Sequence, residues 1–138
     1  MKWIFTCIAI VLIAATCKTS KETMKAATSL YNTKWSLKKI YDNGKEEAVN
    51  TKAFLRFDKE KGSAGGNGSC NSFGSTVSIN EDEVRFKNIF STKMYCAQVQ
   101  QIENKYFNQL GNANKYEIKD RLLILYKDKE KLLEFEAE

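Results

Sequence analysis

GSAGGNGSCNSFGS, residues 62–75, brings together five of the chain's seven glycines and one cysteine, Cys70. A phosphate-binding loop needs Lys-Ser or Lys-Thr after its glycines and then a helix, whereas here the next predicted element is a strand. A dinucleotide-binding fingerprint would need a third glycine where Asn71 stands. Glycines ahead of a strand permit positive φ, a bulge or a close backbone approach. We therefore expect a loop that lets Cys70 reach a partner cysteine.

The first residues of the chain predict export. Residues 1–16 begin with a basic residue and continue in a twelve-residue apolar run, which is too short to span a bilayer. They end in small residues directly before Cys17, as a secretory signal peptide does. The end of this stretch resembles a bacterial lipobox, in which the cysteine receives a thioether lipid and the peptide is cut just before it. An ordinary secretory signal cut near Ala15 is the alternative.

Residues 17–33 are polar and predict a lipidated cysteine followed by a flexible tether. The tether would hold a small domain, residues 34–138, clear of the lipid headgroups. Lys18, not aspartate, follows Cys17, and in a bacterium with two membranes this favours transfer to the outer membrane. We expect the protein to be lipid-anchored in the cell envelope, on the periplasmic face of the outer membrane.

The cysteines predict one disulfide. Cys7 leaves with the signal peptide and Cys17 carries the lipid, so Cys70 and Cys96 remain in a compartment that oxidises thiols. Their pairing would stabilise the domain by roughly 3 to 4 kcal/mol through loop closure. A reactive thiol would need a base and a zinc site would need more ligands, yet the chain has no histidine. We expect neither a metal nor a cofactor.

Hydrophobic periodicity predicts an α+β fold. A 3.6-residue apolar pattern over 97–111 predicts one amphipathic helix, which Gly111 would end. Connections between elements are short, so we expect a curved, mostly antiparallel sheet, a partly closed barrel, with the helix packed on it. Residues 75–79 and 83–88 are expected to form a hairpin, in which Val77 and Ile79 would face Val84 and Phe86. Alternating patterns predict strands from Lys34 to a turn at 42–44 (with a bulge near Ile40), and at 52–58, 75–79, 83–88, 115–119, 121–127 and 131–137.

Charge and composition exclude several function classes. The chain has 22 Lys and Arg residues and 17 Asp and Glu residues, and the basic residues are spread among the acidic ones. A mixed surface of this kind serves solubility, so we expect no nucleic-acid partner and a monomeric domain. The acidic residues fall in turns, on the helix and on outward strand faces, where they make no catalytic pair. We therefore expect no enzymatic activity.

Two short motifs carry a family resemblance. Gly68-Ser69-Cys70-Asn71-Ser72-Phe73 fits the pattern G-x-C-N-x-[FY], and Thr92-Lys93-Met94-Tyr95-Cys96 fits T-[RK]-M-x-C. Both patterns resemble those of the META domain family, which is found in bacterial heat-shock lipoproteins. The resemblance implies a small α+β domain without catalytic residues, in which Gly68, Asn71, Phe73, Thr92 and Met94 are motif positions. We expect Asn71 to satisfy backbone groups of its loop and Met94 to fill the core.

Two functions fit these expectations. The first is a protein-binding module that acts with an unknown envelope protein in stress tolerance or envelope assembly. The second is a carrier that holds a lipid or small hydrophobic ligand in a cavity between sheet and helix. A set of large side chains would fill that space and favour the first function. These side chains are Trp35, Phe54, Phe57, Phe73, Phe86, Phe90, Phe107 and Phe135.

Overall fold

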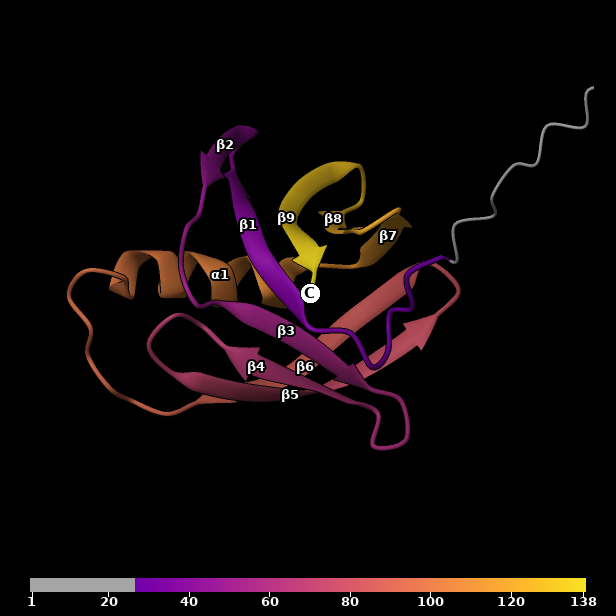
Figure 1. Ribbon diagram of the computed structural model, residues 1–138, viewed down its shortest axis with the longest axis horizontal. Coiled ribbons are helices and arrows are strands. Elements are labelled where there is room, and N and C mark those ends of the chain that lie inside the picture. Colours follow the sequence, from indigo (N-terminus) through magenta and orange to yellow (C-terminus); the bar gives the residue numbers. More distant parts are fainter. Residues whose placement is uncertain (1–26) are drawn as a thin grey trace, which may run out of the picture.

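The computed structural model describes residues 27–138 (Figure 1). The predicted signal peptide, Cys17 and residues 18–26 of the predicted tether lie outside the described residues. Within 27–138, no helix is long and apolar enough to cross a bilayer. The elements are β1 (Trp35–Asp42), β2 (Lys45–Ala48), β3 (Phe54–Asp58), β4 (Ser63–Asn67), β5 (Ser72–Asn80), β6 (Glu83–Ser91), α1 (Gln100–Asn112), β7 (Lys115–Lys119), β8 (Leu122–Lys127) and β9 (Glu130–Ala137).

The strands form one sheet that curls into a ring. Their order is β2-β1-β3-β4-β5-β6-β7-β8-β9, every pairing is antiparallel, and β1 also pairs with β9. β6 and β7 share only the pair Glu83↔Lys115, so the ring is nearly open there. The helix α1 packs on β6, β9 and β1 and crosses behind β1 and β9 in Figure 1. The predicted fold class is therefore confirmed.

Large side chains fill the space between the sheet and α1. Trp35, Tyr106 and Phe135 are fully buried, and the Tyr106 ring meets the edge of the Phe73 ring with centroids 5.6 Å apart. Leu123 and Leu125 of β8 are also fully buried, as expected for a strand with neighbours on both sides. The core thus occupies the interior of the ring and fixes one face of the helix.

The predicted hairpin and bulge are both present. Val77 pairs with Phe86 and Ile79 pairs with Val84, which confirms the expected cross-strand contacts. The register of β1 against β9 shifts between Leu37 and Lys39, next to the predicted bulge at Ile40. Strand alternation in the sequence therefore predicts these registers correctly.

Two strands were not expected. Ser63–Asn67, predicted as loop, forms β4 between β3 and β5. A Cβ on Gly65 would lie only 2.8 Å from the carbonyl oxygen of Phe73, so these glycines allow an unusually close strand approach. Lys45–Ala48 forms β2, a charged strand without apolar alternation, which pairs with β1 through the turn at Gly44.

Several boundaries also differ from the sequence prediction, since β5 begins at Ser72 instead of residue 75 and β6 ends at Ser91 instead of residue 88. The helix runs from Gln100 to Asn112, so Gly111 lies inside it and the chain leaves the helix at Ala113, which is extended. The packed domain begins earlier than residue 34, because Leu30 is buried in the core. The indole N–H of Trp35 donates to the Leu30 carbonyl at 3.0 Å, which fixes this segment. The last residues assigned to the tether therefore belong to the fold.

Candidate functional site

The loop between β4 and β5 lies directly against α1. A Cβ on Gly68 would lie 2.5 Å from the Phe107 ring and 2.6 Å from Glu103 Oε2, so only glycine fits at this position. The backbone N–H of Gly68 donates to the carbonyl of Asn71 at 2.7 Å and closes the loop. Its neighbour Ser69 has φ 109°, a conformation that costs a residue with a side chain some strain. The glycine stretch thus serves close packing against the helix.

Glu103 of α1 is the polar centre of this junction. Its side chain is 1% exposed, and no ion pair within residues 27–138 involves it. The backbone N–H groups of Cys70 and Asn71 donate to Glu103 Oε2 at 3.1 and 2.7 Å. The Asn71 side-chain amide donates to Glu103 Oε1 at 2.6 Å. Three N–H donors therefore replace the water that a carboxylate loses on burial.

Asn71 connects this carboxylate to the segment that follows β6. Its Oδ1 accepts hydrogen bonds from the Met94 backbone N–H and the Thr92 hydroxyl, both at 2.8 Å. Its Nδ2 also donates to the Met94 carbonyl at 3.0 Å. The buried amide therefore holds both backbone groups of Met94, as a neighbouring strand would. We call the side chains of Asn71 and Glu103 the buried anchor.

A disulfide fixes the same segment at its far end. Cys70 and Cys96, 26 residues apart, are joined, and their Cα atoms lie 6.0 Å apart. The predicted pairing is thus present. The carbonyl of Cys96 accepts hydrogen bonds from the N–H groups of Val99 and Gln100 at the start of α1. Residues 92–96 are irregular in conformation but are held at both ends.

Three large apolar side chains project to solvent from the end of β6 and the connection that follows it. Phe90, Met94 and Tyr95 are 70%, 59% and 80% exposed, and together we call them the apolar segment. The Phe90 ring lies over Gly74 on the outer face of the sheet, where a Cβ would come within 2.7 Å of it. The long β6–α1 connection of Figure 1 carries Met94 and Tyr95. Exposed large apolar residues on a fixed backbone are typical of contact surfaces.

Comparison with known proteins identifies the family. Residues 28–138 match the META domain. The chain belongs to the META domain family. No curated protein matches the chain.

Solved structures show the same fold for this META domain. A protein from Burkholderia xenovorans, solved by NMR, has a TM-score of 0.67 at 22% identity and covers 79% of this chain and 83% of its own. A DUF4847 family protein from Bacteroides vulgatus, solved by crystallography, has a TM-score of 0.58 at 16% identity. It covers 83% of this chain and 95% of its own. At these identities the likeness concerns the fold.

The structure brings the two META motifs together and gives their positions different roles. Asn71 is part of the buried anchor, Gly68 and Thr92 lie against it, and Phe73 is buried against α1 beside Tyr106. The Asn71 side chain bonds to the backbone of Met94 in the facing segment, and within its own loop the Asn71 backbone carbonyl accepts a hydrogen bond from the Gly68 N–H. The interpretation of Met94 as a core residue is wrong, because only its backbone is held and its side chain points to solvent.

Phe90 also lies on the opposite face from the one predicted. It pairs across the strands with Gly74, and the neighbouring residue Phe73 is the one that enters the core. Because Phe90 pairs with Gly74, it lies on the same face of the sheet as Gly74. Successive side chains of a strand point to opposite faces, so Phe73 points to the other face and Phe90 and Phe73 cannot both be inside. The register shift between Gly74 and Thr76 places Phe90 on the outer face. Phe54 is likewise only half-buried, on the outside of β3.

Sequence reasoning missed two buried carboxylates. Glu103 stands on the apolar stripe of the helix at the same spacing as Tyr106 and Leu110, and all three are fully buried. An acidic residue at a core position of the stripe was therefore the available signal. Glu134 of β9 was expected on an outward face but is 9% exposed. Its sequence context, with alternating acidic and apolar residues, gave no such signal.

Glu134 sits in a second polar group, formed by Lys39, Tyr41, Glu46 and Glu134, which we call the β1–β9 cluster. The Tyr41 hydroxyl lies 3.3 Å from Glu134 Oε2 and 3.2 Å from Glu46 Oε2. Lys39 Nζ lies 3.0 Å from Glu46 and 3.6 Å from Glu134. Burial and the nearby carboxylates raise the pKa of Tyr41 well above its usual range. The hydrogen bond from Lys39 holds the pKa of Glu46 below its usual value.

Proposed function

We propose that this META domain is a protein-binding module and that the apolar segment is its contact surface. The observation that carries the proposal is the exposure of Phe90, Met94 and Tyr95 within six residues of chain. Tyrosine, phenylalanine and methionine are enriched at protein interfaces, where they bury large apolar areas. The proposed partner is a protein of the cell envelope that takes part in stress tolerance or envelope assembly.

The buried anchor supports this role because it reduces the cost of binding. Binding costs free energy wherever a loop must become ordered at the interface. Here Asn71 holds the backbone of Met94 and the disulfide holds Cys96, so the segment is ordered before a partner arrives. On binding, only the side chains of the apolar segment then lose conformational freedom.

Export and lipid anchoring complete the proposal. A disulfide between Cys70 and Cys96 suits an oxidising compartment outside the cytoplasm. The lipobox-like sequence ending at Cys17 supports a lipid anchor, which would present the domain at the periplasmic face of the outer membrane. The substitution Cys17→Ser is expected to move the protein from the membrane to the soluble fraction. Unchanged membrane association would contradict the anchor.

The carrier alternative has less support. A carrier needs an apolar cavity between sheet and helix, and Trp35, Tyr106 and Phe135 fill that space. A groove on the outside of β3 and β4 has no lining residue from α1. Native mass spectrometry of the purified protein separates the two functions, because a co-purifying lipid would favour the carrier.

Site-specific crosslinking tests the proposed contact surface. A photoreactive amino acid replaces Tyr95 in cells that naturally make the protein, and an exposed residue of β5, Ser78, serves as the matched control. We expect one envelope protein to be crosslinked from position 95 and not from position 78. Identical adducts from both positions, or none from position 95, would contradict the proposal.

A further inference from the structure

The apolar segment contains the one thioether among residues 27–138, that of Met94. Its side chain is 59% exposed, so a small oxidant reaches the sulfur without any opening of the fold. The other two sulfur atoms of these residues belong to Cys70 and Cys96 and are joined to each other. A disulfide has no thiolate, which is the form of cysteine that peroxides oxidise. Met94 is therefore the sulfur of this region that is open to oxidation.

The backbone of Met94 is held independently of its side chain. Its N–H donates to Asn71 Oδ1 at 2.8 Å, and its carbonyl accepts from Asn71 Nδ2 at 3.0 Å. Neither bond involves the thioether, and Met94 is not a member of the hydrophobic core. A chemical change at the sulfur should therefore alter the surface of the domain and leave its fold intact.

We propose that Met94 is an oxidation site, at which a peroxide converts the thioether to a sulfoxide and thereby switches off the contact surface. This inference rests on the proposed function, because it assigns regulation to the same apolar segment. With hydrogen peroxide, the sulfur lone pair attacks one oxygen, the O–O bond breaks and an S–O bond forms. The proton of the transferred oxygen passes to the departing oxygen, which leaves as water. The sulfur loses two electrons and the peroxide gains them.

The sulfoxide changes the chemistry of the apolar segment. Met94 stands in the chain between Phe90 and Tyr95, the two exposed aromatic members of the segment. Oxidation makes a flexible apolar side chain polar, and its S–O oxygen is an acceptor that an apolar partner surface would leave unpaired. Methionine sulfoxide reductases restore the thioether, and an exposed side chain is accessible to such an enzyme. The switch is therefore reversible.

Peptide mapping of the purified protein tests the chemistry of this site. The intact chain is treated with hydrogen peroxide in buffer and in urea, and mass spectrometry follows the fraction of Met94 that has gained one oxygen. We expect the rate in buffer to be at least about a third of the rate in urea, since the folded chain already exposes the sulfur. A slower rate in buffer would overturn the proposal, because it would mean that the fold protects the sulfur.

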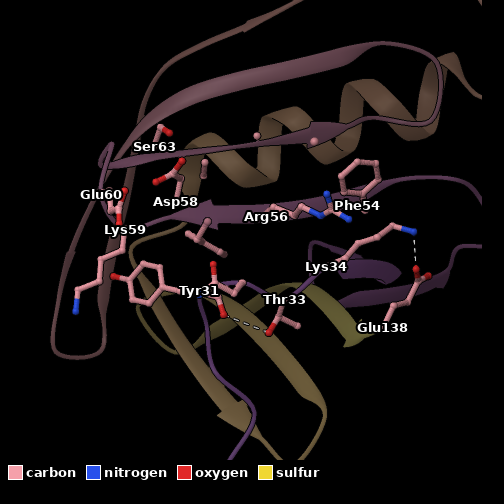
Figure 2. Close-up of a pocket in the computed structure, with 15 residues that line it drawn as sticks. Tyr31, Thr33, Lys34, Phe54, Arg56, Asp58, Lys59, Glu60, Ser63 and Glu138 are labelled. Carbon is pink, nitrogen blue, oxygen red and sulfur yellow. Dashed lines mark hydrogen bonds and ion pairs between the residues drawn. The ribbon is translucent and has the colours of Figure 1, made fainter.

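The groove on the outside of β3 provides a reference region in the same sample (Figure 2). Its lining residues, which include Phe54 and Arg56, contain no sulfur and no member of the apolar segment. We expect the NMR amide signals of these two residues to stay in place on oxidation, while those of Lys93 and Tyr95 shift. The Met94 amide should remain protected from exchange. Loss of that protection would mean that the sulfoxide unfolds the segment, which would overturn a switch confined to the surface.

Crosslinking from position 95 tests the regulation. In cells treated with hydrogen peroxide before irradiation, we expect the yield of the adduct to fall at least fivefold, and to recover once the oxidant is removed and the sulfoxide is reduced. Met94→Leu has no sulfur at this position, so peroxide should not lower whatever yield this variant gives. Met24→Leu removes the other methionine that follows the predicted signal peptide, and it should respond to peroxide as the wild type does.

Two crosslinking results would overturn the proposal and leave the proposed function in place. These are an adduct whose yield does not change with peroxide, and an equal fall in the wild type and in Met94→Leu. The absence of any adduct from position 95 before treatment would instead contradict the proposed function. The two failures are therefore distinguishable.

Discussion

The domain buries two carboxylates in two different ways. Glu103 lies at the junction of loop and helix and receives three N–H donors from Cys70 and Asn71, without a cation. Glu134 lies on the β1–β9 cluster and faces Lys39 and a tyrosine hydroxyl. The first set of partners has fixed directions, because two are backbone groups and the third is an amide held by other bonds. The second set consists of side chains that can rotate.

This difference shows which region specifies its geometry. At the buried anchor, every donor of Asn71 and both backbone groups of Met94 are committed, so a change at one residue leaves buried polar groups unpaired. At the β1–β9 cluster, Lys39 also has Glu46 as a partner and is partly exposed, so water and neighbouring groups can compensate. We therefore expect the anchor to be much less tolerant of substitution.

The largest expected effect comes from the disulfide, which constrains the anchor region alone. Replacing both Cys70 and Cys96 by alanine should lower the free energy of unfolding by about 3 kcal/mol, since loops of this size gain roughly that much from closure. Urea unfolding of the variant and of the wild type, with and without reductant, measures the effect. A reductant that does not change the wild-type midpoint would mean that the two cysteines are not joined.

Matched amide substitutions give the next effect and compare the two carboxylates directly. In Glu103→Gln the new NH₂ group faces a donor in either orientation: the Asn71 side-chain amide, which cannot turn because its oxygen is bonded to Thr92 and Met94, or the backbone N–H groups of Cys70 and Asn71. We expect a loss of about 2 kcal/mol. In Glu134→Gln the Tyr41 hydroxyl can reorient, and the loss should stay below about 1 kcal/mol. Equal losses in urea unfolding would remove the distinction between the regions.

The last effect is similarly small, concerns Tyr41 and depends on pH. The pKa of Tyr41 is raised in the folded state. The contribution of Tyr41 to folding stability is therefore complete below its unfolded pKa of about 10 and is lost as the pH rises above that value. Tyr41→Phe should therefore cost about 1 kcal/mol at pH 7 through its lost hydrogen bonds. That difference from wild type should shrink above about pH 10. A difference that does not change with pH would contradict the raised pKa.

The sequence predicted most of the fold because alternation is strong where one face is buried. The hairpin pairs Val77↔Phe86 and Ile79↔Val84 follow directly from the apolar residues in β5 and β6. β4 was missed because a strand of small residues has no apolar alternation, and its glycines serve close strand contact. β2 was missed because it is charged and only pairs with β1 at the edge.

The candidate site was predictable in its members but not in their geometry. The expected removal of Cys7, the expected lipidation of Cys17 and an oxidising compartment together predicted the Cys70–Cys96 pairing. Asn71 and Thr92 were recognised as motif positions, but the bond from Asn71 to Glu103 depends on where α1 packs, which no local pattern contains. Met94 was assigned to the core because methionine is usually buried there. In the structure only its backbone is held, by Asn71, and its side chain is exposed, which residue type does not reveal.

The most direct test is amide hydrogen exchange at Met94, because the account rests on a buried anchor that orders an exposed segment. In the wild type, the Met94 amide donates to Asn71 and should be strongly protected although its side chain is exposed. In Asn71→Ala, that protection should fall at least tenfold, while the amides of the β8 core strand keep theirs. A wild-type Met94 amide that exchanges at the rate of an unstructured chain would contradict the account.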